Sequence, residues 1–253
     1  MKLLIITDLE GVSGIVDWDE HEKAGPEAKE YNQFLMTNEV NGAIEGALNG
    51  GAEEVWVAES HTIDIRQIHP DAYLLKVGKG IGVSPQCLGM QAGKWDAMAF
   101  IGNHSMADTP NGVLCHTQNL NIKSIYINNI LVGEFGIQAA IAGTLGMPMI
   151  MVSGDEAACL QAKALLPDIE AAVVKYGTGR FSAWCITPAK AKKLIADKME
   201  EALKKWQHIK PFVINGQIHF HEEYYNGMIN EIIASDVIEA VNIRVERIFG
   251  KHK

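Results

Sequence analysis

The sequence lacks several features that would place it in a well-marked class of protein. Its four cysteines show no CxxC spacing, which argues against a zinc ribbon and a disulfide framework and fits a reducing compartment. No apolar run approaches the roughly 20 residues that span a bilayer. A net charge of −9 gives no basic surface for nucleic acid. We therefore expect a cytoplasmic protein that contacts neither a membrane nor nucleic acid.

The sequence does contain apolar runs that alternate with helical patterns, which is the signature of βαβ units. One helix is expected to begin near Thr37 and to stop at Gly50-Gly51, and another to begin at Thr187-Pro188 as N-cap and first helical residue. The pattern predicts an α/β fold with three α/β/α layers and a mainly parallel sheet. The expected strands are Leu3–Ile6, Val55–Ala58, Met98–Ile101, Ile125–Ile127 and Met149–Val152.

The 253 residues can form one large domain or two smaller ones. The most plausible break is Gly177-Thr178-Gly179, which follows the strand-like segment Ala171–Lys175. We therefore predict a metal-binding α/β domain over 1–176 and a smaller, mixed α/β part over 177–253. The last strand of that second part is expected at Ala240–Ile248.

Side chains that can bind metals follow one predicted strand after another. The first strand leads to Asp8 and Glu10, the second to His61 and the third to His104; His116 and Glu134 come later in the chain. Parallel strands end at the same edge of a sheet, so these side chains should converge there. Neighbouring acids at the end of a buried strand repel each other and are costly to desolvate unless a cation lies between them.

Three carboxylates and up to three imidazoles favour zinc, manganese, cobalt or iron over magnesium, which prefers oxygen ligands and water. Five or six ligands exceed the four that one tetrahedral zinc takes. Two ions that share a bridging carboxylate fit the set better, as in binuclear hydrolases. Each residue alone also has an ordinary interpretation: Asp8 as a loop residue, for example, or Glu134 as an acid at a helix N-terminus.

Two other functions compete with a metal-dependent hydrolase. The segment DLEGV resembles the DxDGT opening of haloacid-dehalogenase-type phosphatases, in which Asp8 would be the nucleophile beside magnesium. That alternative leaves the histidines after the strands without a role. A non-catalytic protein that binds a metal or a peptide is also possible, and it predicts a closed coordination sphere. His219 and His221 flank Phe220 and are expected to form a surface pair.

Six short segments in a fixed order resemble the zinc D-aminopeptidases associated with dipeptide transport. They are Asp8-Leu9-Glu10-Gly11, Ser60-His61, Asn103-His104, Thr109-Pro110 with His116, Tyr126-Ile127-Asn128 and Val132-Gly133-Glu134. The resemblance runs from the N-terminus to about Lys175 and continues less specifically through Thr187–Ala191.

The resemblance implies two zinc ions per subunit, with ligands at Asp8, Glu10, His61, His104 and Glu134 and a further active-site residue at His116. It also implies a ring-like homo-oligomer, a ring of five or a decamer of two stacked rings, whose internal channel admits short peptides. On this basis we expect an aminopeptidase that prefers D-amino acids and uses a hydroxide held between two zinc ions bridged by Asp8. His116 would stabilise the tetrahedral intermediate or pass a proton to the leaving amine.

Overall fold

The computed structural model describes residues 1–18, 25–58, 67–75 and 94–249. Its larger sheet has seven strands in the order β3-β2-β1-β4-β7-β8-β9. All neighbouring strands in it are parallel except the pair formed by β8 and β9. The strands are β1 (Lys2–Thr7), β2 (Glu54–Ala58), β3 (Ala72–Leu75), β4 (Ala97–Asn103), β7 (Met149–Asp155), β8 (Glu170–Gly179) and β9 (Ser182–Cys185).

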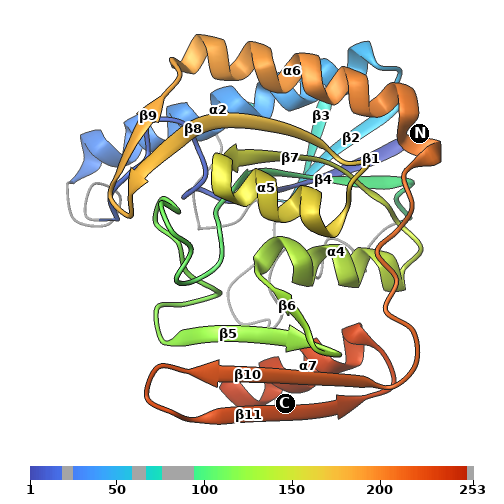
Figure 1. Cartoon of the computed structure of the whole chain (residues 1–253). Coiled ribbons are helices and arrows are strands. Elements are labelled where there is room, and N and C mark those ends of the chain that lie inside the picture. Colours follow the sequence, from blue (N-terminus) through green and yellow to red (C-terminus); the bar gives the residue numbers. More distant parts are fainter. Residues whose placement is uncertain (19–24, 59–66, 76–93, 250–253) are drawn as a thin grey trace.

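Helices cover both faces of this sheet (Figure 1). On one face lie α2 (Pro26–Asn49) and α6 (Pro188–Lys205), followed by the short helix η1 (Trp206–His208). On the other lie α4 (Glu134–Thr144) and α5 (Glu156–Leu165). In β1, Leu3 and Ile5 belong to the core on the α2 and α6 side, whereas Leu4 and Ile6 belong to the opposite core. Because both faces of the strand are buried, its sequence is a continuous apolar run. The predicted three-layer, mainly parallel fold is confirmed.

A second, antiparallel sheet lies beyond α4 (Figure 1). Its order is β11-β10-β5-β6. The strands are β5 (Ile122–Ile127), β6 (Ile130–Val132), β10 (Ile218–Tyr224) and β11 (Ile229–Ala234), and α7 (Val237–Phe249) packs against β10 and β11. This sheet therefore joins the middle of the chain to its C-terminal part. The predicted boundary between residues 176 and 177 lies within β8, a strand of the first sheet.

Three of the predicted elements differ from the structure. The helix expected from Thr37 begins at Pro26, after Gly25 with φ of 85°, and its first turns are mostly exposed, so they show no apolar periodicity. The predicted strand Ala240–Ile248 is part of α7, where Val237, Ala240, Val241 and Arg244 are buried at helical spacing. The strand expected at Ile125–Ile127 belongs to the second sheet and is antiparallel.

The other predicted strands, the end of the first helix before Gly50 and the start of α6 at Pro188 are confirmed. Among the described residues, we find no helix with the length and apolar character needed to cross a membrane.

Candidate metal centre

Asp8 and Glu10 lie in the turn that follows β1, and both are almost completely buried. The turn is fixed to the end of β4, because the Asp8 amide donates to the carbonyl of Ile101 at 2.8 Å and the Gly11 amide to that of Gly102 at 2.7 Å. A Cβ at Gly11 would lie 2.1 Å from the carbonyl oxygen of Asn103, so only glycine permits this approach. The turn after β1 therefore places two carboxylates at the end of the neighbouring strand β4.

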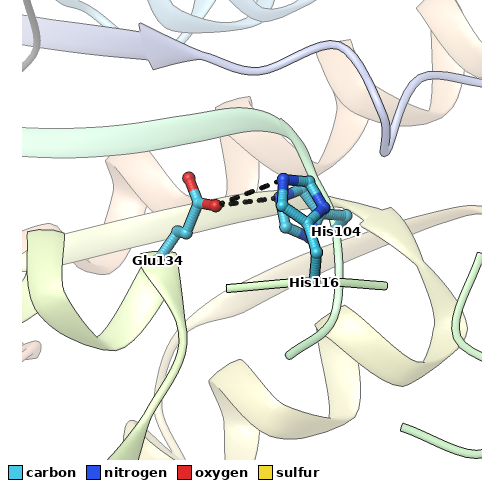
Figure 2. A group of neighbouring side chains, drawn as sticks. All are labelled: His104, His116 and Glu134. Carbon is cyan, nitrogen blue, oxygen red and sulfur yellow. Dashed lines mark ion pairs between the residues drawn. The ribbon is translucent and has the colours of Figure 1, made fainter. Parts of the chain in front are cut away.

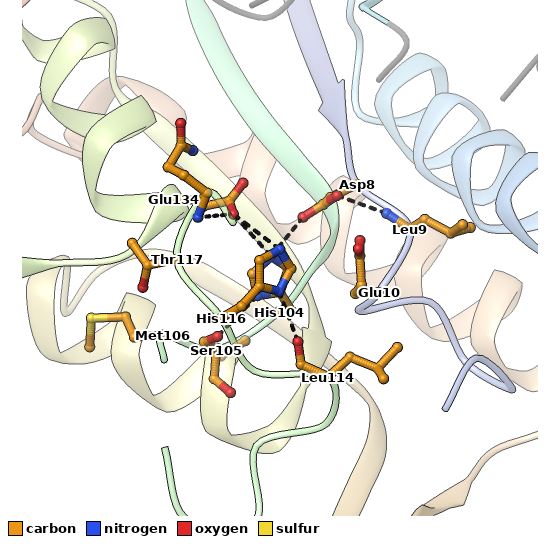
Figure 3. A network of polar contacts seen from close by, with 12 residues as sticks. Asp8, Leu9, Glu10, His104, Ser105, Met106, Leu114, His116, Thr117 and Glu134 are labelled. Atoms are coloured by element: carbon orange, nitrogen blue, oxygen red, sulfur yellow. Dashed lines mark hydrogen bonds and ion pairs between the residues drawn. The ribbon is translucent and has the colours of Figure 1, made fainter. Parts of the chain in front are cut away.

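His104 is the first residue after β4 and faces two of the three carboxylates. Its Nε2 lies 3.4 Å from Oδ2 of Asp8 and 3.2 Å from Oε1 of Glu134, while its Nδ1 donates to the Ser105 carbonyl at 2.9 Å (Figure 3). Since a carbonyl only accepts, the Nδ1–H···O bond directs Nε2 toward the acids. A histidine that binds a metal through one nitrogen commonly donates from the other to a carbonyl or carboxylate in this way.

Glu134 reaches the same place from the opposite direction. It is the first residue of α4 and follows β6 of the second sheet, so it does not come from the carboxyl end of a parallel strand, as the sequence had suggested. Its Oε1 accepts a hydrogen bond from the Gln118 amide at 2.8 Å. Its place in the first turn of a helix also favours a negative charge.

His116 lies beside His104 in the loop after β4. The two imidazole rings are stacked, with centroids 4.0 Å apart and an interplanar angle of 12° (Figure 2). The Nδ1 of His116 donates to the Leu114 carbonyl at 2.9 Å, and its Nε2 lies 3.7 Å from Oε1 of Glu134. Leu114 has φ of 51°, a left-handed conformation that is uncommon for leucine. This backbone turn brings the Leu114 carbonyl within reach of His116.

The loop that carries His116 is bonded to two other parts of the chain and to its own first residues. The amide of Leu114 donates to the Arg180 carbonyl at 2.8 Å, and the amide of Val113 donates to Oδ2 of Asp155 at 3.2 Å. The amide of His116 itself donates to the carbonyl of Ser105 at 3.3 Å. Backbone hydrogen bonds of the loop, and not a regular strand or helix, thus fix the position of His116.

The charges in this cluster depend strongly on one another. Burial alone would lower the pKa of His104, but the charges of Glu134, Asp8 and Glu10 outweigh it and raise that pKa to about 10. Burial likewise would raise the pKa of Glu134, and the charge on His104 instead holds it below its ordinary value. For His116, burial and the neighbouring charge of His104 lower the pKa. A protonated His104 therefore takes the place of a cation among three carboxylates.

The donor atoms form two groups that share His104. One consists of Asp8, Glu10 and His104 and the other of His104, His116 and Glu134, and within each group the donor atoms lie within 4.8 Å of one another. Ligand distances near 2.1 Å with tetrahedral angles place donors about 3.4 Å apart, close to the separations around Nε2 of His104. The donor set therefore fits divalent cations. Five of the predicted site residues converge, and the sixth, His61, lies outside the described residues.

Beneath the site, a fully buried lysine holds the segment that carries Glu10. Lys175, on β8, donates from Nζ to the backbone carbonyls of Glu10, Val12 and Ile15, the last two at 3.0 and 2.6 Å. Burial lowers the pKa of Lys175 to about 8, against the opposing charges of Asp155 and Glu39. We did not identify Lys175 from the sequence, where its only signal is a lysine at the end of an apolar run.

Glu39, on α2, completes this support. Its Oε1 accepts the amide hydrogen of Ser13 at 2.8 Å, and the Ser13 hydroxyl donates to the carbonyls of Ile186 and Val174 at 2.6 and 3.1 Å. Burial raises the pKa of Glu39 to about 7, although the Ser13 bond and the charge of Lys175 act in the opposite direction. The segment after Glu10 is therefore fixed from both α2 and β8.

Trp18, Arg180 and Phe181 form an aromatic and cationic group beside His116. The Trp18 ring meets those of His116 and Phe181 edge-on, each at 5.7 Å between centroids, and its Nε1 donates to Oε1 of Glu10 at 3.3 Å. The guanidinium of Arg180 lies 5.2 Å from the centre of the Trp18 ring. We did not identify these three residues from the sequence, because no motif marks them.

A cavity of about 200 Å³ adjoins His104 and Glu134 on the side of α4 and α5. Met106, Leu131, Val132 and Leu165 give it apolar walls, and Gln161 adds a polar group. The candidate centre is therefore next to a space that suits a small apolar side chain.

Three comparisons with known proteins point to one family. A sequence model of the family described as D-aminopeptidase, peptidase family M55, matches residues 1–242. A D-aminopeptidase of Bacillus subtilis (strain 168) is 35% identical over 218 residues, which cover 83% of this chain and 77% of that protein. Among solved structures, the Zn-dependent D-aminopeptidase DppA from Bacillus subtilis, a self-compartmentalizing protease, is similar with a TM-score of 0.87. The similarity covers 98% of this chain and 97% of that one at 29% identity.

Proposed function

The chain belongs to the D-aminopeptidase family, and we propose that it is a zinc-dependent aminopeptidase that removes D-amino acids from the N-terminus of short peptides. The observation that carries this proposal is the convergence of Asp8, Glu10, His104 and Glu134 on one buried point, with His104 common to both groups of donors. Three carboxylates near one point are costly to bury without cations, and two divalent ions would remove that cost.

The ligands we assign to zinc are Asp8, Glu10, His104 and Glu134, together with His61, which lies outside the described residues. Asp8 would hold zinc through Oδ2, which faces Nε2 of His104, whereas its Oδ1 accepts the Leu9 amide hydrogen at 3.0 Å. Zinc, when bound, polarises a carbonyl group and lowers the pKa of water to about 7, which supplies a nucleophile at neutral pH. The zinc dependence of the similar solved structure supports this choice of metal.

We assign proton transfer to His116. Its Nδ1 carries the proton donated to the Leu114 carbonyl, so in the neutral ring Nε2 has a free lone pair on the side of Glu134. The lowered pKa of His116 favours that neutral form. Nε2 can therefore accept a proton as the nucleophile forms and return it to the leaving amine. No covalent bond between His116 and the substrate is needed for this role.

The surroundings suggest how a short peptide would bind. A site rich in carboxylates suits the free amino group of a short peptide, and the apolar cavity beside Glu134 suits its first side chain. Arg180 is exposed and lies over the Trp18 ring, which contacts His116, so it can pair with the terminal carboxylate of a dipeptide or tripeptide. Recognition of both ends would restrict cleavage to short substrates.

We also propose a closed homo-oligomer, a decamer of two five-membered rings with the sites facing an internal channel. The name of the similar structure, a self-compartmentalizing protease, supports assembly. Large exposed apolar side chains on this chain support it as well: Trp184 on edge strand β9 is 75% exposed, and Tyr31 and Phe34 stack on the outside of α2. The measurement is the molar mass in solution, by light scattering.

The catalytic proposal is tested with purified, zinc-loaded protein on matched D- and L-alanine amides, the corresponding dipeptides and p-nitrophenyl phosphate. We expect cleavage of the D-amide and the D-dipeptide, loss of that activity after chelation, and recovery when zinc is restored. Hydrolysis of the phosphate ester alone would favour the phosphatase alternative. Stoichiometric zinc without turnover of any substrate would favour a binding protein.

A further inference from the structure

A group of side chains on the second sheet is not used by the proposed reaction. His219 and His221 lie two residues apart on β10, so they project from the same face of the sheet. Glu231, on β11, is the direct cross-strand partner of His221. His219 and Glu231 are exposed and His221 is partly exposed. The three side chains therefore meet at the surface, on a sheet separate from the strands that carry Asp8 and His104.

The donor atoms of these three residues already have the separations of a coordination site. Oε1 of Glu231 lies 3.4 Å from Nε2 of His219 and 3.2 Å from Nδ1 of His221, and all three donors lie within 4.8 Å of one another. Zinc bonds of about 2.0–2.1 Å at tetrahedral angles place ligand atoms about 3.4 Å apart. One ion can thus contact all three side chains with little movement.

A second carboxylate orients the ring of His221. Oε1 of Glu223 lies 3.3 Å from Nε2 of His221, and Oε2 of Glu223 accepts the hydroxyl hydrogen of Ser124 at 3.0 Å. Both carboxylates only accept, so without an ion a protonated His221 ring donates to Glu223 from Nε2 and to Glu231 from Nδ1 at 3.2 Å; when an ion replaces the Nδ1 proton, Nε2–H still donates to Glu223. A histidine held by a carboxylate on one nitrogen and free to bind on the other is the usual arrangement at metal centres.

We propose that His219, His221 and Glu231 form a second metal site, independent of the catalytic centre, for a divalent transition ion such as zinc, nickel or copper. Two imidazoles and one carboxylate favour these ions over magnesium or calcium, which prefer oxygen ligands. Three protein ligands leave a fourth position open to water or to another ligand. Protonated imidazoles can also satisfy Glu231 and Glu223 without an ion, so metal content is the property that decides between the two arrangements.

The experiment compares zinc content per chain, measured by elemental analysis after equilibrium dialysis of the full, active protein in zinc buffer. The variants are His219→Gln with His221→Gln, and separately Glu231→Gln, with His208→Gln on η1 as the matched control. We expect wild type and control to bind one more zinc per chain than the other variants, with equal turnover of a D-amino-acid amide. All variants keep the same catalytic residues, so any zinc at the catalytic centre contributes equally to each. The difference in zinc content therefore reports on the second site alone.

A third variant tests the orienting role of Glu223. Replacing a carboxylate that orients a metal-binding histidine typically weakens metal binding by about 10-fold or more. Glu223→Gln should therefore shift the zinc titration of this site to higher concentration while the total capacity is kept. Equal zinc content in wild type and the double histidine variant would overturn the proposal, as would the same loss in the His208→Gln control.

Discussion

The side-chain amine of Lys175 donates a hydrogen bond to the backbone carbonyl of Glu10, a residue 165 positions earlier in the chain. The same amine also bonds to the carbonyls of Val12 and Ile15. Strand β8, next to the edge strand of the first sheet, thus fixes the segment that presents one of the proposed zinc ligands. Lys175 touches neither the cavity nor the other ligands, so we assign it a positioning role.

Lys175→Met should destabilise the protein and weaken zinc binding. The substitution removes the amine and leaves three buried carbonyls without it, and each orphaned group costs on the order of 1–3 kcal/mol. We expect the free energy of unfolding to fall by about 3 kcal/mol and the zinc content per chain to fall with it. Urea unfolding and elemental analysis measure the two quantities. Lys204→Met, on the exposed side of α6, is the control and should change neither; a Lys175→Met variant with wild-type stability and zinc content would refute the positioning role.

His116→Ala should separate catalysis from metal binding. His116 is not among the assigned zinc ligands, so the variant should keep its zinc while kcat falls by about 10²–10⁴-fold, the usual contribution of general acid–base catalysis. Stopped assays on a D-alanine amide, with zinc content determined on the same sample, check this. Near-normal turnover with zinc bound would exclude the assigned role, whereas loss of zinc would make His116 a ligand instead.

Arg180→Gln should discriminate between substrates with and without a free carboxylate. An ionic hydrogen bond of about 1.5–3 kcal/mol corresponds to roughly 10–100-fold in binding, so the KM for a dipeptide should rise by about that factor. The KM for an amino-acid amide, which has no carboxylate, should stay unchanged, and Arg180→Lys should restore part of the loss. If both substrates lose activity equally, Arg180 acts by supporting the loop through its bond to the Cys115 carbonyl at 3.1 Å.

Glu39 should make stability depend on pH. Its pKa of about 7 in the folded chain exceeds the ordinary 4.5, so the folded state binds more protons between these values and stability falls as pH rises from about 5 to 8. Glu39→Gln cannot titrate. Its free energy of unfolding relative to wild type should therefore increase by about 3 kcal/mol over that interval. Urea unfolding at the two pH values measures this, with Glu30→Gln at an exposed position of α2 as the control; a constant difference for Glu39→Gln would contradict the assignment.

Most of the first sheet could be predicted from the sequence because its strands are buried on both faces and so read as apolar runs. The predictions failed where that signal is weak or ambiguous. The first turns of α2 are mostly exposed, so only the later, buried half of the helix showed periodicity. In α7 the run of valine and isoleucine resembled a strand, although burial of Val237, Val241 and Arg244 follows a helical period.

The candidate site could be predicted where side chains that can bind metals follow strands, as Asp8, Glu10 and His104 do. Glu134 was identified correctly as a neighbour of these residues but for an incomplete reason, because it arrives from the second sheet through β6. The supporting residues could not be inferred. Nothing in the sequence tells whether Lys175 is buried or which carbonyls it meets, since that depends on contacts between segments more than 100 residues apart.

The most direct test is a crystal structure of zinc-loaded protein with anomalous scattering recorded on both sides of the zinc edge. The proposed centre predicts two anomalous peaks in each chain among Asp8, Glu10, His104 and Glu134, one of them bound by Nε2 of His104. Absence of anomalous density around His104 in crystals that contain zinc, or peaks bound by none of these four side chains, would contradict it.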